Sequence, residues 1–144
     1  MRKVMKITIV LALLAVPSAA LAASNTGQPQ AINCTQFKTK PMRITLSCGD
    51  GSSWLGKLKW SSWSKTQAVA SGNFTQNNCT PDCATGRTHS VAMTVTLSKV
   101  KNCPGQGKVS PAFKHATIVY KGTRPKGAPL SANFSCPPSL PGAY

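Results

Sequence analysis

Two side-chain carboxylates are all that this chain offers for chemistry that needs a pair of carboxyl groups. Asp50 and Asp82 are its only acidic residues, and it contains no glutamate. Hydrolysis of a glycosidic bond needs two carboxyl groups that flank the bond. Asp50 lies between two glycines and Asp82 follows a proline, positions where an Asp side chain commonly accepts hydrogen bonds from nearby backbone amides. We therefore expect both aspartates to stabilise turns.

The two histidines, His89 and His115, suggest a second kind of chemistry. Two imidazoles and a lysine can supply the base, the acid and the phosphate stabiliser of a ribonuclease. No Gly-x-Ser-x-Gly elbow marks a serine as a nucleophile. A small secreted hydrolase that uses His89 and His115 is therefore one alternative function. The residues favour a non-catalytic protein, and we assign no catalytic, cofactor-binding or metal-binding residue.

Cationic side chains are the strongest chemical signal in the sequence. Three of the 17 Lys and Arg lie in residues 1–22. Residues 23–144 therefore contain fourteen cationic and two acidic side chains, which gives them a net charge of +12. Such a charge attracts polyanions. Basic residues interleaved with aromatic rings can hold phosphates while bases or sugars stack. The candidate polyanion contacts are Lys57, Lys59, Trp60, Trp63, Lys65, Lys121, Arg124 and Lys126.

These cations predict a non-catalytic binder of an anionic polymer or cell-envelope surface. The partner would be a wall polymer, lipid headgroups or extracellular nucleic acid. The competing interpretation is that lysines cover the solvated faces and edges of strands while tryptophans belong to the core. That interpretation leaves the shortage of acids unexplained, because a solubilising surface usually mixes both signs.

Six cysteines, all after residue 22, indicate a disulfide framework. Cys79 and Cys83 can pair around a Pro-Asp turn. For the others we favour Cys34 with Cys48 and Cys103 with Cys136, with a Cys34–Cys136 bridge as the alternative. The absence of a Cys-x-x-Cys pair and of paired histidine spacing argues against zinc. A disulfide-closed loop from Cys79 to Cys83 also allows a third function, a secreted protein-interaction or inhibitor module that presents a rigid projection.

The first 22 residues resemble a secretory leader. A basic start at 1–6 precedes an apolar run at 7–16 and a small-x-small ending at Ala22. About ten apolar residues are too few to span a membrane, which needs roughly twenty. We expect a signal peptide at 1–22, a flexible lead-in at 23–32, a β domain at 33–136 and a Pro-rich tail at 137–144, in a secreted, extracellular protein without an integral membrane span.

Apolar residues recur mostly at every second position, which predicts strands. In the run 54–63 this period places Leu58 and Trp60 on one face and Leu55 and Trp63 on the other. Clusters of Gly, Pro, Asn and Asp separate the runs. The expected fold is all-β: one antiparallel sandwich or small barrel of about six or seven short strands, stapled by disulfides. The expected strands lie within 42–48, 54–63, 66–74, 89–97, 113–120 and 130–136.

Three motifs together resemble a group of small exported actinobacterial proteins. They are CGDG at 48–51, WSSW at 60–63 and NCTPDCATGR at 78–87, and the similarity extends from about Met42 to Gly127. The resemblance implies a secreted, disulfide-bonded β domain from a bacterium. It carries over no catalytic or binding residue, so the function depends on the residues themselves.

Overall fold

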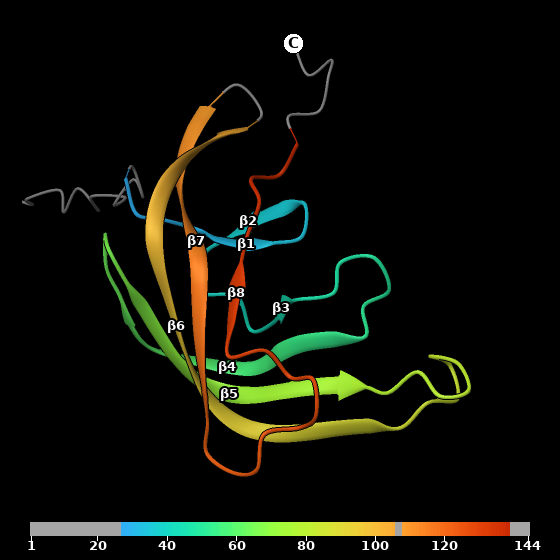
Figure 1. Ribbon diagram of the computed structural model, residues 1–144. Helices are drawn as coiled ribbons and strands as arrows, with labels where there is room; N and C mark the ends of the chain where they lie inside the picture. The colour runs from blue at the N-terminus through green and yellow to red at the C-terminus, as the bar shows by residue number, and fades with distance from the viewer. Residues whose placement is uncertain (1–26, 106–107, 139–144) are drawn as a thin grey trace, which may run out of the picture.

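The computed structural model, which describes residues 27–105 and 108–138, contains two antiparallel sheets (Figure 1). Six strands form the larger sheet in the order β3-β4-β5-β6-β7-β8, and β1 and β2 form the smaller one. The all-β prediction is confirmed. The strands are β1 (Ala31–Asn33), β2 (Gln36–Lys38), β3 (Ile44–Thr45), β4 (Ser53–Trp63), β5 (Ala68–Asn77), β6 (Thr88–Gly105), β7 (Lys108–Tyr120) and β8 (Ser131–Asn133).

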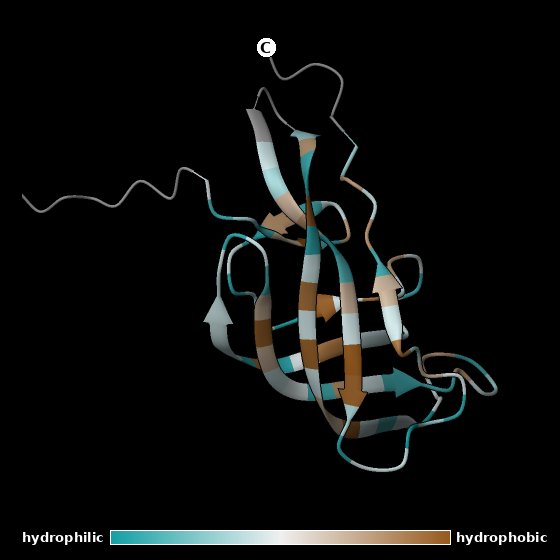
Figure 2. Cartoon of the chain, turned by 60° about the vertical axis from the view of Figure 1, so that its left-hand side comes forward, coloured by the Kyte–Doolittle hydropathy of each residue, from teal (hydrophilic) through white to brown (hydrophobic). Residues whose placement is uncertain are grey.

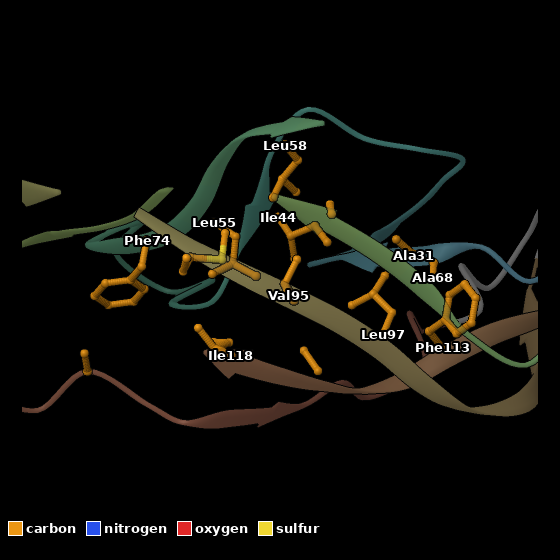
Figure 3. Close-up of a cluster of buried hydrophobic side chains, with 14 residues drawn as sticks. Ala31, Ile44, Leu55, Leu58, Ala68, Phe74, Val95, Leu97, Phe113 and Ile118 are labelled. Carbon is orange, nitrogen blue, oxygen red and sulfur yellow. The ribbon is translucent and has the colours of Figure 1, made fainter. Parts of the chain in front are cut away.

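The six-stranded sheet curves into a half-barrel, and its concave face holds the core. Side chains from five adjacent strands, β3 to β7, meet there with β1, which contacts both β3 and β7 (Figure 3). A single curved sheet buries only one face, so its strands alternate between apolar and polar residues. The larger buried side chains of this core are Ile44, Leu55, Leu58, Phe74, Met93, Val95, Leu97, Phe113 and Ile118.

The long central strands follow the alternation in the sequence. Met93, Val95 and Leu97 on β6 are fully buried, whereas the residues between them are partly exposed. Figure 2 shows this pattern as hydrophobic and polar segments that alternate along the strands. β6 continues to Gly105, eight residues beyond the expected run, because its part from Met93 to Gly105 pairs with β7 from end to end.

The prediction for the faces of β4 is wrong. Its register with β5 shifts twice, between Gly56 and Lys59 and again near Trp60. Each irregularity changes which residues face inward, because side chains on a regular strand alternate strictly. Leu55 and Leu58 are consequently both buried. Trp60 packs against the same core as Trp63, and their rings meet edge-on with centroids 4.6 Å apart.

The outer strands are shorter than expected. Only Ile44–Thr45 of the run 42–48 is a strand, and Met42 is 76% exposed. Only Ser131–Asn133 of the run 130–136 is a strand, and it pairs with β7. At the other end, β1 starts inside the segment expected to be a lead-in, and both Ala31 and Ile32 are buried. The ordered β structure therefore begins before residue 33.

Three disulfides staple the fold, in the pairs that the sequence favours. They link Cys34 to Cys48, Cys79 to Cys83 and Cys103 to Cys136. The alternative Cys34–Cys136 bridge does not form. Such a set of bridges indicates an oxidising environment, typically outside the cytoplasm.

Candidate polyanion-binding surface

The convex side of the half-barrel, here called the outer face, carries mostly Ser and Thr side chains, together with lysine and valine. One row crosses four strands as Lys59, Ser71, Thr94 and Val119, each opposite the next. No element of the described chain covers these positions, which are exposed or partly exposed. The next row consists of Ser62, Val69, Thr96, Thr117 and Ser131.

An arginine and a tryptophan stack at one edge of the outer face. The guanidinium carbon of Arg43 lies 4.2 Å from the centroid of the Trp54 ring. Gly56 makes room for this arrangement, because a Cβ atom there would lie 3.1 Å from two atoms of the Trp54 indole. The half-buried ring thus lies against the sheet next to Gly56, with a cation beside it. Guanidinium–indole stacking of this kind is a common cation–π contact.

Three lysines extend the positive charge from this stack. Lys57 occupies the first irregularity of β4, and Lys59 faces outward opposite Ser71. Lys121 lies at the end of β7, where its backbone N–H donates to the carbonyl oxygen of Ala92 at 2.9 Å. Neighbouring strands are about 4.8 Å apart, so three strand spacings separate the β4 lysines from Lys121 by about 14 Å. The outer cation set is defined here as Arg43, Lys57, Lys59 and Lys121; all four are exposed.

Trp60 and Trp63, two of the predicted contacts, lie on the opposite side of β4. Their rings pack against the core. The indole N–H of Trp60 donates to the carbonyl oxygen of Pro41 at 2.8 Å, and that of Trp63 donates to Pro29 at 3.0 Å. Both rings therefore serve internal packing. The tryptophan on the outer face is Trp54. The sequence pattern that could have indicated it is a tryptophan two residues before a glycine within one expected strand.

The other predicted contacts are distributed over different parts of the molecule. Lys65 is exposed in the turn between β4 and β5, whereas Arg124 and Lys126 lie in the loop between β7 and β8. Cations outside the prediction also occur on β2, β6 and β7. Positive charge thus covers several faces of the protein. The outer face is distinguished by the combination of cations with a stacked aromatic ring.

The two histidines do not form a joint site. His89 lies at the start of β6, while His115 pairs with Ser98, nine residues farther along that strand. At about 3.3 Å per residue, roughly 30 Å of strand separates the two positions. His115 also shares a 2.8 Å hydrogen bond with the side chain of Asn133. This geometry does not support a reaction in which both imidazoles act on one bond.

Both aspartates stabilise turns, as the sequence predicts. Asp50 accepts a hydrogen bond from the backbone N–H of Ser52 at 2.9 Å. Asp82 accepts one from the backbone N–H of Thr85 at 2.8 Å and one from its hydroxyl at 2.9 Å. These bonds, the backbone one foremost, lower the pKa of each carboxyl. Neither carboxylate is therefore arranged as a general acid.

Asp50 also lies close to the Cys79–Cys83 pair, with the potential ligand atoms of the three residues within 4.8 Å of one another. Cys79 and Cys83 are bonded to each other, so neither provides the thiolate that a metal ion needs. The cluster is a contact between two loops.

The loop between β5 and β6 is exposed and internally braced. Asn77 uses its side-chain oxygen to accept from the backbone N–H of Cys79 and its side-chain nitrogen to donate to the carbonyl of Cys83. The side-chain oxygen of Asn78 accepts from the backbone N–H groups of Thr80 and Arg87. In Figure 1 this loop projects from one end of the sheet.

No protein-family model, curated protein or solved structure matches the chain. Among the residues described, no helix is long and apolar enough to cross a membrane.

Proposed function

We propose that this protein is secreted and binds an anionic polymer outside the cell, without catalysis, through the outer face. The observation that carries the proposal is the stack of Arg43 on Trp54 beside Lys57 and Lys59. The cations can hold phosphates or other anionic groups, while the ring offers a surface for a base or a sugar.

The electrostatics of the whole chain support this proposal. The only two carboxylates are engaged in their own turns, and the hydrogen bonds that lower their pKa come from nearby backbone and hydroxyl groups. Both aspartates lie in loops, Asp50 between β3 and β4 and Asp82 between β5 and β6, and not on the strands that form the outer face. Each contact with a polymer anion releases a condensed counterion, which makes the affinity depend steeply on salt.

The test compares two triple variants of equal net charge. Lys57→Asn, Lys59→Gln and Lys121→Gln remove three outer cations, and Asn suits the positive φ of Lys57. Binding of fluorescein-labelled polyphosphate is measured by anisotropy at salt concentrations from about 50 to 300 mM. We expect the slope of log affinity against log salt to fall in magnitude by about 2.

The matched control removes three cations elsewhere, with Lys38→Gln, Lys40→Asn and Lys101→Gln. Lys40 also has positive φ, so it too is replaced by Asn. The control variant should retain most of the affinity and the original salt slope. Equal losses in the two variants would mean that net charge alone determines binding. If the affinity of the wild-type protein for polyphosphate did not change with salt concentration, the proposal would be wrong.

Replacing Trp54 identifies the kind of polymer. Stacking of a nucleobase on an aromatic ring contributes about 1–3 kcal/mol. Trp54→Leu should therefore weaken binding of a single-stranded oligonucleotide at least fivefold if nucleic acid is the partner, and should leave polyphosphate binding nearly unchanged. Trp54 has no role in the main core cluster, so the variant is expected to fold. Equal, small effects on both probes would point to a polymer without bases.

A second candidate function is supported by the braced loop between β5 and β6. A loop closed by Cys79–Cys83 and held by Asn77 and Asn78 loses little entropy when it binds a protein partner. A partner of this kind should stay bound at high salt, whereas a polyanion should be released. Capture from culture medium at low and high salt separates the two functions.

A further inference from the structure

The side chain of Lys114 on β7 lies against a disulfide. Its ammonium nitrogen Nζ is 3.2 Å from the sulfur of Cys136 and 3.9 Å from the sulfur of Cys103. Disulfide sulfurs are weak hydrogen-bond acceptors, so the neutral bridge is a poor partner for a full positive charge. Burial, and then the charge of Lys101, lower the pKa of Lys114. A thiolate in place of the disulfide would be a better partner for this lysine.

The two cysteines of this bridge differ in access. Cys103 is fully buried in the smaller core cluster, together with Ile32 and Ala112, whereas Cys136 is partly exposed. Thiol–disulfide exchange begins when a thiolate attacks a sulfur that it can reach. An incoming thiolate would therefore attack Cys136 and release Cys103. The sheltered sulfur of Cys103 would then be available to close the bridge again.

Lys114 lies where negative charge develops during such an exchange. In the transition state the charge of the attacking thiolate is shared among the attacking sulfur, Cys136 and Cys103. The lysine nitrogen contacts the last two of these sulfurs. A cation held at a site of developing charge lowers the barrier, and a neighbouring lysine also favours the thiolate form of a cysteine. Cys136 should therefore react readily in both the closed and the open state.

The other two bridges have different surroundings. Within the described residues, no lysine or arginine donates a hydrogen bond to their sulfurs. The Cys48 sulfur lies 3.9 Å from the backbone oxygen of Thr45. Cys79 and Cys83 lie beside the carboxylate of Asp50. An oxygen acceptor or a carboxylate disfavours a neighbouring thiolate, so these two bridges are internal controls for the effect of Lys114.

The segment that carries Cys136 also has contacts that do not depend on the bridge. β8 pairs with β7, and the backbone N–H of Phe134 donates to the carbonyl oxygen of Lys114 at 2.9 Å. Phe134 packs against both core clusters. These contacts should keep Cys103 and Cys136 close to each other after the bridge opens. An opened bridge can then form again within the folded protein.

We propose that the Cys103–Cys136 bridge is a site of thiol–disulfide exchange with a dithiol of a partner protein. Cys136 is the exchanging cysteine, Cys103 is the buried resolving cysteine, and Lys114 stabilises the thiolate at Cys136. The site contains none of the outer cation set, so it is independent of the polymer-binding function proposed for the outer face.

The exchange proceeds in two balanced steps. First, a thiolate of the partner forms a bond to the Cys136 sulfur while the Cys103–Cys136 bond breaks, and Cys103 leaves as a thiolate that takes up a proton. Second, the other thiolate of the partner attacks the partner's own sulfur in this mixed disulfide, and Cys136 leaves as a thiolate beside Lys114. The partner dithiol is oxidised to a disulfide, and the bridge is reduced by the same two electrons.

The test follows the opening of each bridge in the native, oxidised protein at neutral pH. Dithiothreitol serves as the dithiol; freed cysteines are alkylated with N-ethylmaleimide at successive times and located by peptide mass spectrometry. Lys114→Met removes the charge and keeps a long side chain. We expect Cys103–Cys136 to open about three- to tenfold more slowly in this variant, since a tenfold change corresponds to about one pKa unit. The opening rates of the other two bridges should not change.

Two variants serve as controls for charge and for position. Lys101→Met removes the neighbouring cation that acts on Lys114, and it should change the opening rate less than twofold. Lys114→Arg keeps the charge and should restore most of the wild-type rate. Both controls are measured with the same reagent and under the same conditions.

A further variant measures the thiolate directly. In Cys103→Ala, the pH dependence of alkylation by iodoacetamide gives the pKa of the Cys136 thiol. This pKa should lie at least about one unit below the ordinary cysteine value of about 8.5, and should rise toward that value when Lys114→Met is added. The comparison of opening rates does not depend on the folding of this variant.

Three results would overturn the proposal. The first is an equal opening rate of Cys103–Cys136 in the wild type and in Lys114→Met. The second is an equal slowing by Lys101→Met, which would mean that overall charge attracts the attacking thiolate. The third is an opening rate equal to the rate of global unfolding in the same buffer, because the folded protein would then not exchange. None of these results affects the salt dependence of polyphosphate binding, so the two proposals fail separately.

Discussion

Gly56 determines where the Trp54 ring can lie, because any larger side chain would meet the indole. Sequence reasoning selected Trp60 and Trp63 for the surface and overlooked this pair. Those two rings donate hydrogen bonds to proline carbonyls 19 and 34 positions away in the chain. Contacts at such separations leave no local sequence signal. The turn roles of the aspartates were predictable because their partners lie two and three residues away.

The hydrogen bonds of Asp82 give a pH-dependent contribution to stability. Its folded-state pKa is lowered, first by the Thr85 backbone N–H and then by the Thr85 hydroxyl. The contribution is therefore present above the ordinary Asp pKa of about 3.9 and is lost as the pH falls through the lower folded-state value. The melting temperature should decline more steeply below about pH 4 in the wild type than in Asp82→Ala. Superimposable pH profiles would contradict this role.

Among the elements, β5, β6 and β7 were predictable because most of each strand alternates between buried and more exposed residues. β4 was predictable as a strand, but its faces were not. Its irregularities depend on the register with β5, and register is a property of two strands that neither sequence shows alone. The same irregularity places Lys57 on the surface between Gly56 and the buried Leu58.

The close approach of β4 and β5 at this irregularity can be tested through Gly72. A Cβ atom there would lie 2.6 Å from the backbone oxygen of Gly56 and 3.0 Å from Leu58. Because a backbone atom cannot easily move aside, Gly72→Ala should lower the free energy of unfolding by about 1–3 kcal/mol in urea titrations with the disulfides intact. Gly122→Ala is the control, since its Cβ would lie 3.9 Å from Val91, and it should change stability by less than about 0.5 kcal/mol. Equal stability of the two variants would argue against the tight contact.

For the whole molecule, composition predicted a cationic, disulfide-bonded protein and the period-two apolar pattern predicted an all-β fold. The structure confirms the fold class and the three bridges. The arrangement of charge could not be predicted to the same degree. Alternation assigns a lysine to a face of its own strand, but the pairing of strands decides which lysines become neighbours. Lys121 lies on the same sheet as Lys57 and Lys59 because the strand order β4-β5-β6-β7 places the end of β7 three strands from β4.

The curvature of the six-stranded sheet limits the shape of partner that the outer face could bind. A flat, stiff partner such as a bilayer or a crystalline lamella touches a bulging surface along a single line, so it would engage the cations of one strand at a time. A pliable thread can bend over the bulge and reach from Arg43 to Lys121 in one pass. The curved outer face is therefore better suited to a flexible polymer chain than to a flat surface.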